Sequence, residues 1–353
     1  MNNNEKILGI LNRKRPDDAS KTERHVHFEI PPTQSFEEYS DPDSQEEEDF
    51  EYSQNTIKYL PVDLKNVGDL SKVPKLAGPI FQNAKEASKN FVIPDFLQDS
   101  NQNLSLKADQ IENFKKIRNK SIEIFFGLSN EFETSLETIY LASLYLDQII
   151  CDHSSSIPQS DPKTSNKDLQ LFILSIFWIA SKFIDRFPPR ISKLIGTIAS
   201  PSSIKESDLI KHELQTLRLL GFQLNYSSPR FFVRRFLEII QASQQIGETI
   251  TFFCDLSLFD PIFRSYPPYV IAYASVLVGL YSNHLQNNFL IFQLKESFPI
   301  EEMDQVLNCA QKLVAFAIDY FENQTFLIER YTNPPFSSAI AKISEILPHI
   351  HFQ

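Results

Sequence analysis

The segment from Leu169 to Phe183 constrains the fold more than any other part of the chain, because it is apolar nearly all round. At about 15 residues it is too short to span a bilayer, so it is expected to be a buried helix. A helix without a polar face must be surrounded by other helices. Ala180 and Ser181 are small and would let a neighbouring helix approach closely, and Pro188 and Pro189 would end the helix.

Further helices are expected on both sides of this segment. Thr134, followed three residues later by Glu137, predicts a capping box. Gly221 is typical of a helix C-terminus, and Ser228 before Pro229 is typical of an N-cap and first helical position. Apolar periodicity predicts two successive bundles of about five helices. The expected helices cover residues 108–128, 136–150, 169–183, 190–198, 207–220, 230–241, 247–259, 268–283, 289–296 and 300–322.

The ends of the chain differ from this helical region. The first sixty residues contain 14 acids and 7 bases, and the run from Glu37 to Glu51 contains nine acids and no bases. Such a run buries too little apolar surface to offset the entropy of ordering, so we expect a disordered acidic leader. The last thirty residues contain Pro334, Pro335 and Pro348 and are expected to pack as an irregular tail.

Several classes of protein are disfavoured by composition. Only 8 glycines are present and no GxGxxG or GxxxxGK[ST] string occurs, which argues against a nucleotide-binding α/β fold. The formal net charge of −11 argues against a direct nucleic-acid partner. Three widely spaced cysteines suggest a reducing compartment without disulfides. Cys151 and His153 lack further ligands, so no metal site or cofactor is expected. No catalytic set with plausible spacing is present, so we predict a binding protein rather than an enzyme.

Three strings, in order, carry a family resemblance. They are Tyr145–Gln148 at the end of a helix, Ala180–Pro189, and His212–Leu224 followed by Ser228–Phe236. Together they resemble the cyclin box.

The resemblance continues beyond the box. The strings Phe252–Leu258 and Tyr266–Ser275 resemble the second cyclin fold of the mitotic, A/B-type cyclins. About 230 residues are covered, from near 92 to 322.

The resemblance implies an all-α fold with two tandem five-helix cyclin-fold bundles. The expected divisions are a leader over 1–90, an N-terminal cyclin box over 91–226, a C-terminal cyclin fold over 227–324 and a tail over 325–353. It also implies a non-catalytic regulatory subunit that binds and activates a cyclin-dependent protein kinase in cell-cycle control. The expected partners are that kinase, as a heterodimer, and substrates of the kinase, with no nucleic acid or membrane. The expected location is the nucleus or cytoplasm.

Family residues can be placed on matching positions. Lys182 and Glu213 match the charged centre of the kinase interface, and Phe183 and Ile184 could supply flanking apolar area. Taken alone, Lys182 and Glu213 would be interpreted as an ordinary salt bridge between helices, and it is the surrounding motif that favours the interface. Arg118 and Asp147 match a structural ion pair of the box.

One aligned region departs from the family pattern. The family's substrate-docking groove corresponds here to Ile117, Arg118, Ser121 and Ile124, with Lys120 and Ser121 replacing apolar residues. We therefore expect a degenerate docking patch. An alternative function is a cyclin-fold adaptor in transcription, either a transcriptional cyclin or a scaffold like a general transcription factor, although the acidic charge argues against the latter.

Overall fold

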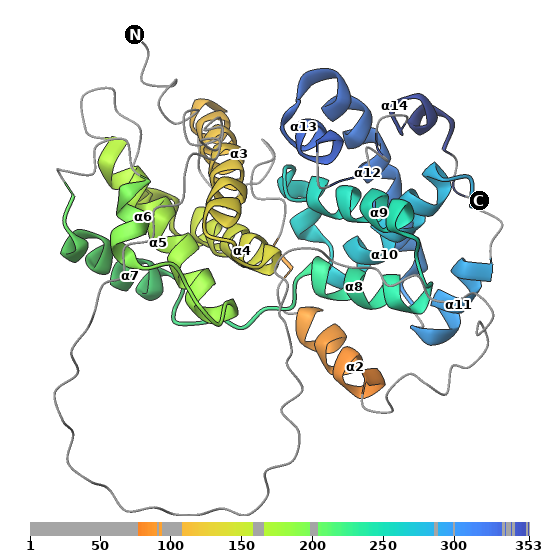
Figure 1. Ribbon diagram of the computed structural model, residues 1–353, viewed down its shortest axis with the longest axis horizontal. Coiled ribbons are helices and arrows are strands. Elements are labelled where there is room, and N and C mark those ends of the chain that lie inside the picture. The colour runs from red at the N-terminus through yellow and green to blue at the C-terminus, as the bar shows by residue number, and fades with distance from the viewer. Residues whose placement is uncertain are drawn as a thin grey trace, which may run out of the picture. The chain divides into compact units, whose positions relative to one another are not determined.

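The computed structural model describes residues 77–89, 92–93, 108–157, 166–197, 204–285, 289–298, 301–333 and 343–350, and the single positions 336, 340 and 352 (Figure 1). All regular structure in these residues is helical, as the sequence predicts. The predicted helices are confirmed, with ends that agree within three residues. The acidic run Glu37–Glu51 lies outside the described residues.

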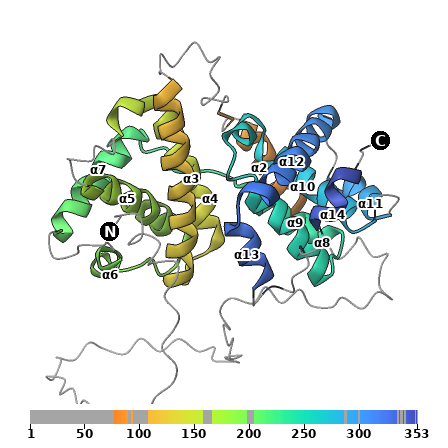
Figure 2. The same cartoon turned by 90° about the horizontal axis from the view of Figure 1, so that it is seen from above.

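Among the residues that the structure describes, the first bundle has five helices. They are α3 (Ala108–Glu131), α4 (Leu136–His153), α5 (Asn166–Ile184), α6 (Ile191–Gly196) and α7 (Glu206–Leu219). Helix α4 contacts both α3 and α5, and α5 lies beside α7, on the left in Figures 1 and 2. Helix α5 is the apolar segment of the sequence, and its central residues are buried among these neighbours.

The described part of the second bundle also has five helices. They are α8 (Pro229–Ile239), α9 (Gln244–Leu256), α10 (Pro268–Ser282), α11 (Phe289–Ser297) and α12 (Met303–Asn323). Helix α10 contacts α8, α9 and α12 and is buried along almost its whole length. Gly279 of α10 lies against α9, where an added Cβ would approach Ile250 Cγ1 to 2.4 Å. Only glycine therefore allows these two helices to pack this closely.

The predicted helix ends agree with the structure at two positions and differ at a third. Ser228 caps α8 by accepting a hydrogen bond from the Phe231 N–H at 3.0 Å, with Pro229 in the first turn. Gly221 follows α7 with a φ of 57°. The capping box at Thr134 is wrong. The N-cap of α4 is Ser135, and the Glu137 carboxylate accepts a hydrogen bond from the Ser228 hydroxyl instead.

A helix also lies where the sequence predicted only leader. Helix α2 (Ala77–Ser88) packs against α10. The Phe81 ring of α2 stacks on the Phe231 ring, with centroids 4.7 Å apart. Lys85 and Ser88 lie on the same face of α2 and are buried. The assignment of all residues up to 90 to a disordered leader is therefore wrong for α2. Two of the buried positions on this face are polar, which hides the helical periodicity of the segment.

The tail likewise contains helical turns. Helix α13 (Phe326–Thr332) follows α12, and α14 (Ile343–Ile346) is continued by a 3-10 turn over Leu347–His349. Tyr331 of α13 is buried, and its hydroxyl donates to Asp255 Oδ2 at 2.7 Å. The tail is thus more regular than expected, because α13 supplies part of the buried core.

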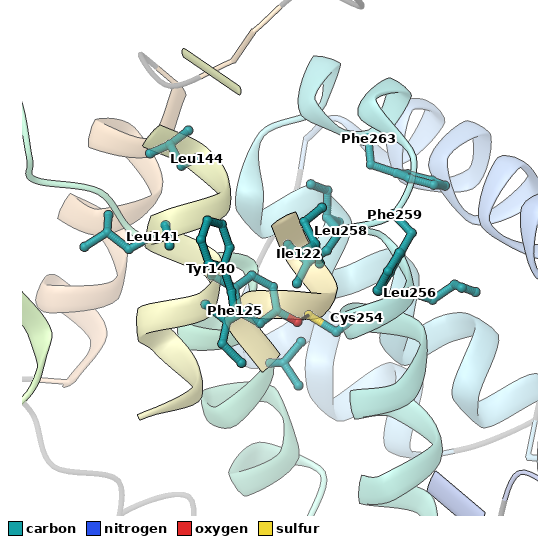
Figure 3. Close-up of a cluster of buried hydrophobic side chains, with 14 of the residues drawn as sticks. Ile122, Phe125, Tyr140, Leu141, Leu144, Cys254, Leu256, Leu258, Phe259 and Phe263 are labelled. Carbon is teal, nitrogen blue, oxygen red and sulfur yellow. Dashed lines mark hydrogen bonds between the residues drawn. The ribbon is translucent and has the colours of Figure 1, made fainter. Parts of the chain in front are cut away.

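The two bundles contact one another through apolar and polar side chains. Figure 3 shows Ile122, Phe125 and Tyr140 of the first bundle facing Cys254, Leu258 and Phe259 of the second. The Tyr140 hydroxyl donates to Asp255 Oδ1 at 2.6 Å, so Asp255 accepts hydrogen bonds from the first bundle and from α13 together. Since a buried carboxylate is costly unless it is hydrogen-bonded, these contacts fix how the bundles meet.

Candidate functional site

Lys182 and Glu213 form an ion pair between α5 and α7. The Lys182 ammonium donates a hydrogen bond to Glu213 Oε1, and the lysine side chain remains 36% exposed while that of Glu213 is 16% exposed. The Lys182 Nζ also lies 3.8 Å from the centroid of the Trp178 ring, one turn earlier on α5. A carboxylate and an aromatic face therefore hold the ammonium at the surface, where part of its hydrogen-bonding capacity stays open to solvent.

The pair is positioned by close packing of α5 on α7. At the centre of this contact the hydroxyls of Ser175 and Thr216 are 2.8 Å apart, and both residues are buried. Small hydroxyl side chains let the two helices approach, and their mutual hydrogen bond satisfies groups that would otherwise be costly to bury. Thr216 lies three residues after Glu213, so this contact fixes the helix that carries the carboxylate.

Asp185 anchors the end of α5. Its carboxylate accepts hydrogen bonds from the Ser135 backbone N–H, the Thr138 hydroxyl and the Ser181 hydroxyl, each at 2.8 Å. Asp185 therefore joins the C-terminal end of α5 to the N-terminal end of α4. Sequence analysis did not identify this residue, because two of its three partners, Ser135 and Thr138, lie about fifty positions earlier.

The segment after α5 is fixed by Trp178. The Trp178 indole Nε1 donates to the Pro189 carbonyl at 3.1 Å, so the same side chain contacts Lys182 with its face and the Pro188–Pro189 segment with its edge. Together with Asp185, this leaves the residues between Lys182 and Pro189 held at both ends. Such a segment presents its side chains in a defined arrangement.

Exposed apolar side chains accompany the ion pair on these helices. Phe183 and Ile184, which sequence analysis named, are exposed at the end of α5. Four others were missed: Phe187, which is 80% exposed, Ile210 and Leu214 on α7, and Phe222 just after α7. Ile210 and Leu214 are four residues apart, so they share a helix face, and Glu213 lies beside them. The sequence does contain a sign of Ile210 and Leu214. Helix α7 has more apolar residues than are needed for the one buried face that includes Leu209.

Phe222 has an unusual backbone conformation. Its φ is 59°, a left-handed value that is uncommon for a bulky residue, and it is 61% exposed. An exposed aromatic side chain held in a strained conformation is a feature more typical of binding sites than of solvent-facing turns.

Arg118 and Asp147 are paired in the interior. Arg118 Nε donates to Asp147 Oδ1 at 2.6 Å and Nη2 donates to Oδ2 at 3.0 Å, with both side chains fully buried. The remaining Nη1 donates to the Leu258 carbonyl of the second bundle at 2.7 Å. Arg264 Nε lies 3.5 Å from the same aspartate. This pair therefore joins α3, α4 and the second bundle and is not available to a partner.

The residues of the expected docking patch lie along α3. Ile117 and Ser121 are buried, and the Ser121 hydroxyl donates to the Ile117 carbonyl at 2.7 Å. Ile124 is half-buried against the core, and Lys120 pairs with Glu123 at 2.7 Å. Arg118 is paired with Asp147 in the interior, and Ile117 and Ser121 are buried. The patch therefore presents few side chains at the surface.

The described residues include no group of three histidine, cysteine, aspartate or glutamate side chains able to hold a metal ion. Burial, together with Asp152, raises the pKa of the Cys151 thiol to about 11, so it is protonated at neutral pH. Among the same residues, no helix is long and apolar enough to cross a membrane.

Comparison with known proteins matches both bundles. The profile described as "Cyclin, N-terminal domain" matches residues 80–225, and "Cyclin, C-terminal domain" matches residues 228–346. The chain is 26% identical over 224 residues to "G2/mitotic-specific cyclin-B3" of Gallus gallus, covering 64% of this chain and 50% of the relative. It is 24% identical over 201 residues to "Cyclin-A2-1" of Oryza sativa subsp. japonica, covering 56% and 39%.

The chain spans about half or less of the length of these curated relatives. Among solved structures, a viral cyclin from herpesvirus saimiri aligns with a TM-score of 0.49 at 16% identity, covering 67% of this chain and 96% of the viral one. The first profile covers α3 to α7 and the second covers α8 to α12, in order along the chain. The chain therefore belongs to the cyclin family, a family of non-catalytic regulators of protein kinases.

Proposed function

We propose that this chain binds and activates a cyclin-dependent protein kinase, as the regulatory subunit of a heterodimer. The observation that carries the proposal is the Lys182–Glu213 pair, held on two packed helices and accompanied by exposed apolar side chains. We further propose a role in cell-cycle control at mitosis, in the nucleus or cytoplasm. The relatives named as mitotic cyclins support this role, at low identity.

The mechanism follows from the needs of a protein kinase. Its catalytic lysine pairs with a glutamate on a mobile helix, and both that helix and the activation segment must be in place for phosphoryl transfer. A partner that presents a rigid, complementary surface favours the active position of the helix by binding it selectively. In this chain, Lys182 would donate to carbonyl groups of the kinase, while Phe183 and Ile184 would contact its apolar side chains.

The missed apolar residues extend this surface. Ile210 and Leu214 flank Glu213 on α7, and burying them against a partner would contribute about 25 cal/mol for each Å² of apolar area removed from water. We include them, with Phe187 and Phe222, in the proposed kinase-binding surface. Their exposure in the free chain is otherwise unfavourable, which supports a partner that covers them.

The first test removes the charged pair. Lys182→Ala with Glu213→Ala is expected to weaken kinase binding at least tenfold while helicity by circular dichroism stays unchanged. The free chain should lose little stability, since an exposed ion pair contributes about 0–1 kcal/mol.

A matched control is available on α3. Lys116 and Glu112 form another exposed ion pair, 3.4 Å apart, and their double alanine variant should bind the kinase as the wild type does. Unimpaired binding of the Lys182/Glu213 variant, measured by calorimetry with the purified kinase, would refute the proposed surface.

Two further assignments remain proposals. We propose that the box and the second cyclin fold divide near residues 226 and 227, which the ends of the two matched profiles at 225 and 228 support. We also propose that the patch around Ile117 and Ser121 is degenerate and does not recruit substrates as the family groove does. The burial of both residues supports this.

A further inference from the structure

Three basic side chains gather just after α5. Arg186, Arg190 and Lys193 are exposed and lie within eight positions that contain no acid. Within the described part of the chain, none of the three has a carboxylate in ion-pair range. This basic cluster is unexpected in a protein with a formal net charge of −11.

The nearest acid in the sequence does not neutralise the cluster. Asp185 immediately precedes Arg186, but its two carboxylate oxygens accept hydrogen bonds from Ser135, Thr138 and Ser181. These contacts direct the carboxylate toward α4. The positive charge of the basic cluster is therefore left for solvent or for a partner.

The basic cluster is continuous with the proposed kinase-binding surface. The Trp178 ring contacts the Lys182 ammonium with its face, and its indole N–H donates to the Pro189 carbonyl. Arg190 directly follows Pro189, so it lies next to this hydrogen bond. The Arg186 guanidinium lies 5.3 Å from the ring centroid of Phe187, whose side chain is the most exposed large apolar one among the described residues. A partner that covers Lys182 and Phe187 would therefore also meet the arginines.

We propose that the basic cluster binds an acidic segment of the partner kinase and so selects kinases that carry negative charge at that place. This inference rests on the proposed function. Arginine clusters recognise acidic segments through charge-assisted hydrogen bonds. At the rim of an interface, such charges mainly raise the association rate and exclude partners of like charge.

The test compares two variants with the same change in charge. Arg190→Glu with Lys193→Glu reverses two charges of the cluster. Lys116→Glu with Lys295→Glu reverses two exposed charges elsewhere, so each variant lowers the formal charge by four, from −11 to −15. Association rates of the full chain are measured against a panel of purified cyclin-dependent kinases, and the kinase that the wild type binds most tightly is used.

The expected result is specific to the cluster. At low ionic strength the Arg190/Lys193 variant should associate about tenfold more slowly than the control variant, because steering depends on local charge. Near 1 M salt, where the screening length is about 3 Å, the two rates should converge. Equal rates for the two variants at low salt would overturn the inference.

The design separates failure of this inference from failure of the proposed function. If the Lys182/Glu213 variant loses binding and the Arg190/Lys193 variant does not, the kinase surface stands and the basic cluster has no part in it. If the wild type binds no kinase of the panel, the proposed function fails and the inference fails with it.

Discussion

The buried pair of Arg118 and Asp147 should respond unequally to loss of each partner. Asp147 faces two arginines, with Arg118 in bidentate contact and Arg264 Nε at 3.5 Å. Replacing the acid by Asp147→Asn leaves two buried positive charges without a counter-charge. Replacing the base by Arg118→Met leaves the aspartate still opposite Arg264.

The size of each effect can be worked from these contacts. Breaking a buried ion pair by removing one partner costs about 3–5 kcal/mol. Arg118→Met should fall near the lower end, because Arg264 offsets part of the charge, although the Leu258 carbonyl also loses its donor. Asp147→Asn should reach or exceed the upper end. For a chain of 353 residues, whose entropy of unfolding at Tm is about 0.7 kcal/mol/K, about 3–5 kcal/mol corresponds to a fall in Tm of about 4–7 °C.

Thermal and urea denaturation followed by circular dichroism would measure both variants. Lys116→Met, which removes an exposed ion pair on the same helix as Arg118, is the control and should change stability by less than about 1 kcal/mol. If Arg118→Met proves as destabilising as Asp147→Asn, then Arg264 does not share the aspartate and the reasoning is wrong.

Three further variants test other contacts. Gly279→Ala should destabilise the chain by about 1–3 kcal/mol in urea denaturation, because the new methyl group would overlap Ile250. Burial raises the pKa of Glu137 above its ordinary value of 4.5. The protonated carboxyl therefore contributes to the free energy of unfolding at low pH, and this contribution is lost as pH rises through the folded pKa. The stability of Glu137→Gln relative to wild type should therefore increase between pH 4.5 and 7, and a constant difference would contradict this. Trp178→Phe keeps an aromatic face for the lysine but loses the hydrogen bond to Pro189, so kinase affinity should fall by a few-fold at unchanged helicity, and unchanged affinity would show that this bond does not order the surface.

Much of the fold could be predicted because its signals are local. The apolar run of α5, the Ser228–Pro229 start of α8 and the glycine after α7 each specify a helix or a helix end from a few neighbouring residues. The capping box at Thr134 failed for the opposite reason. Glu137 is hydrogen-bonded by Ser228, which is 91 positions away, and no local pattern reveals that contact.

Helix α2 was missed because its buried face is partly polar. Lys85 is 5% exposed, with its Nζ 5.2 Å from the ring centroid of Tyr269 and 5.8 Å from that of Phe298. Burial of a lysine depends on those rings and on Glu302, which lies 3.9 Å away, and all three come from the second bundle. Hydrophobic periodicity alone could not identify this face.

The candidate site was predictable only in part. Lys182 and Glu213 were named from the family resemblance, and the structure brings them into contact. The supports of that pair, Asp185 and Trp178, act through tertiary hydrogen bonds, and nothing in their immediate sequence distinguishes them. The sequence shows more apolar positions than the core needs, which indicates that some of them, such as Phe187, are exposed. It does not show which ones, because exposure depends on which helix faces are covered in the folded chain.

The hydrogen bond from Tyr331 to Asp255 has a consequence for synthesis on the ribosome. Asp255 is made about 75 residues before this donor, and until α13 emerges from the exit tunnel Asp255 Oδ2 must find its hydrogen bond in water, while Oδ1 can already accept from Tyr140. The second bundle therefore cannot reach its final dry packing around Asp255 while it is being translated. Nascent chains halted before residue 331 should remain open to water and protease at this point, even though every helix from α3 to α12 has already been made.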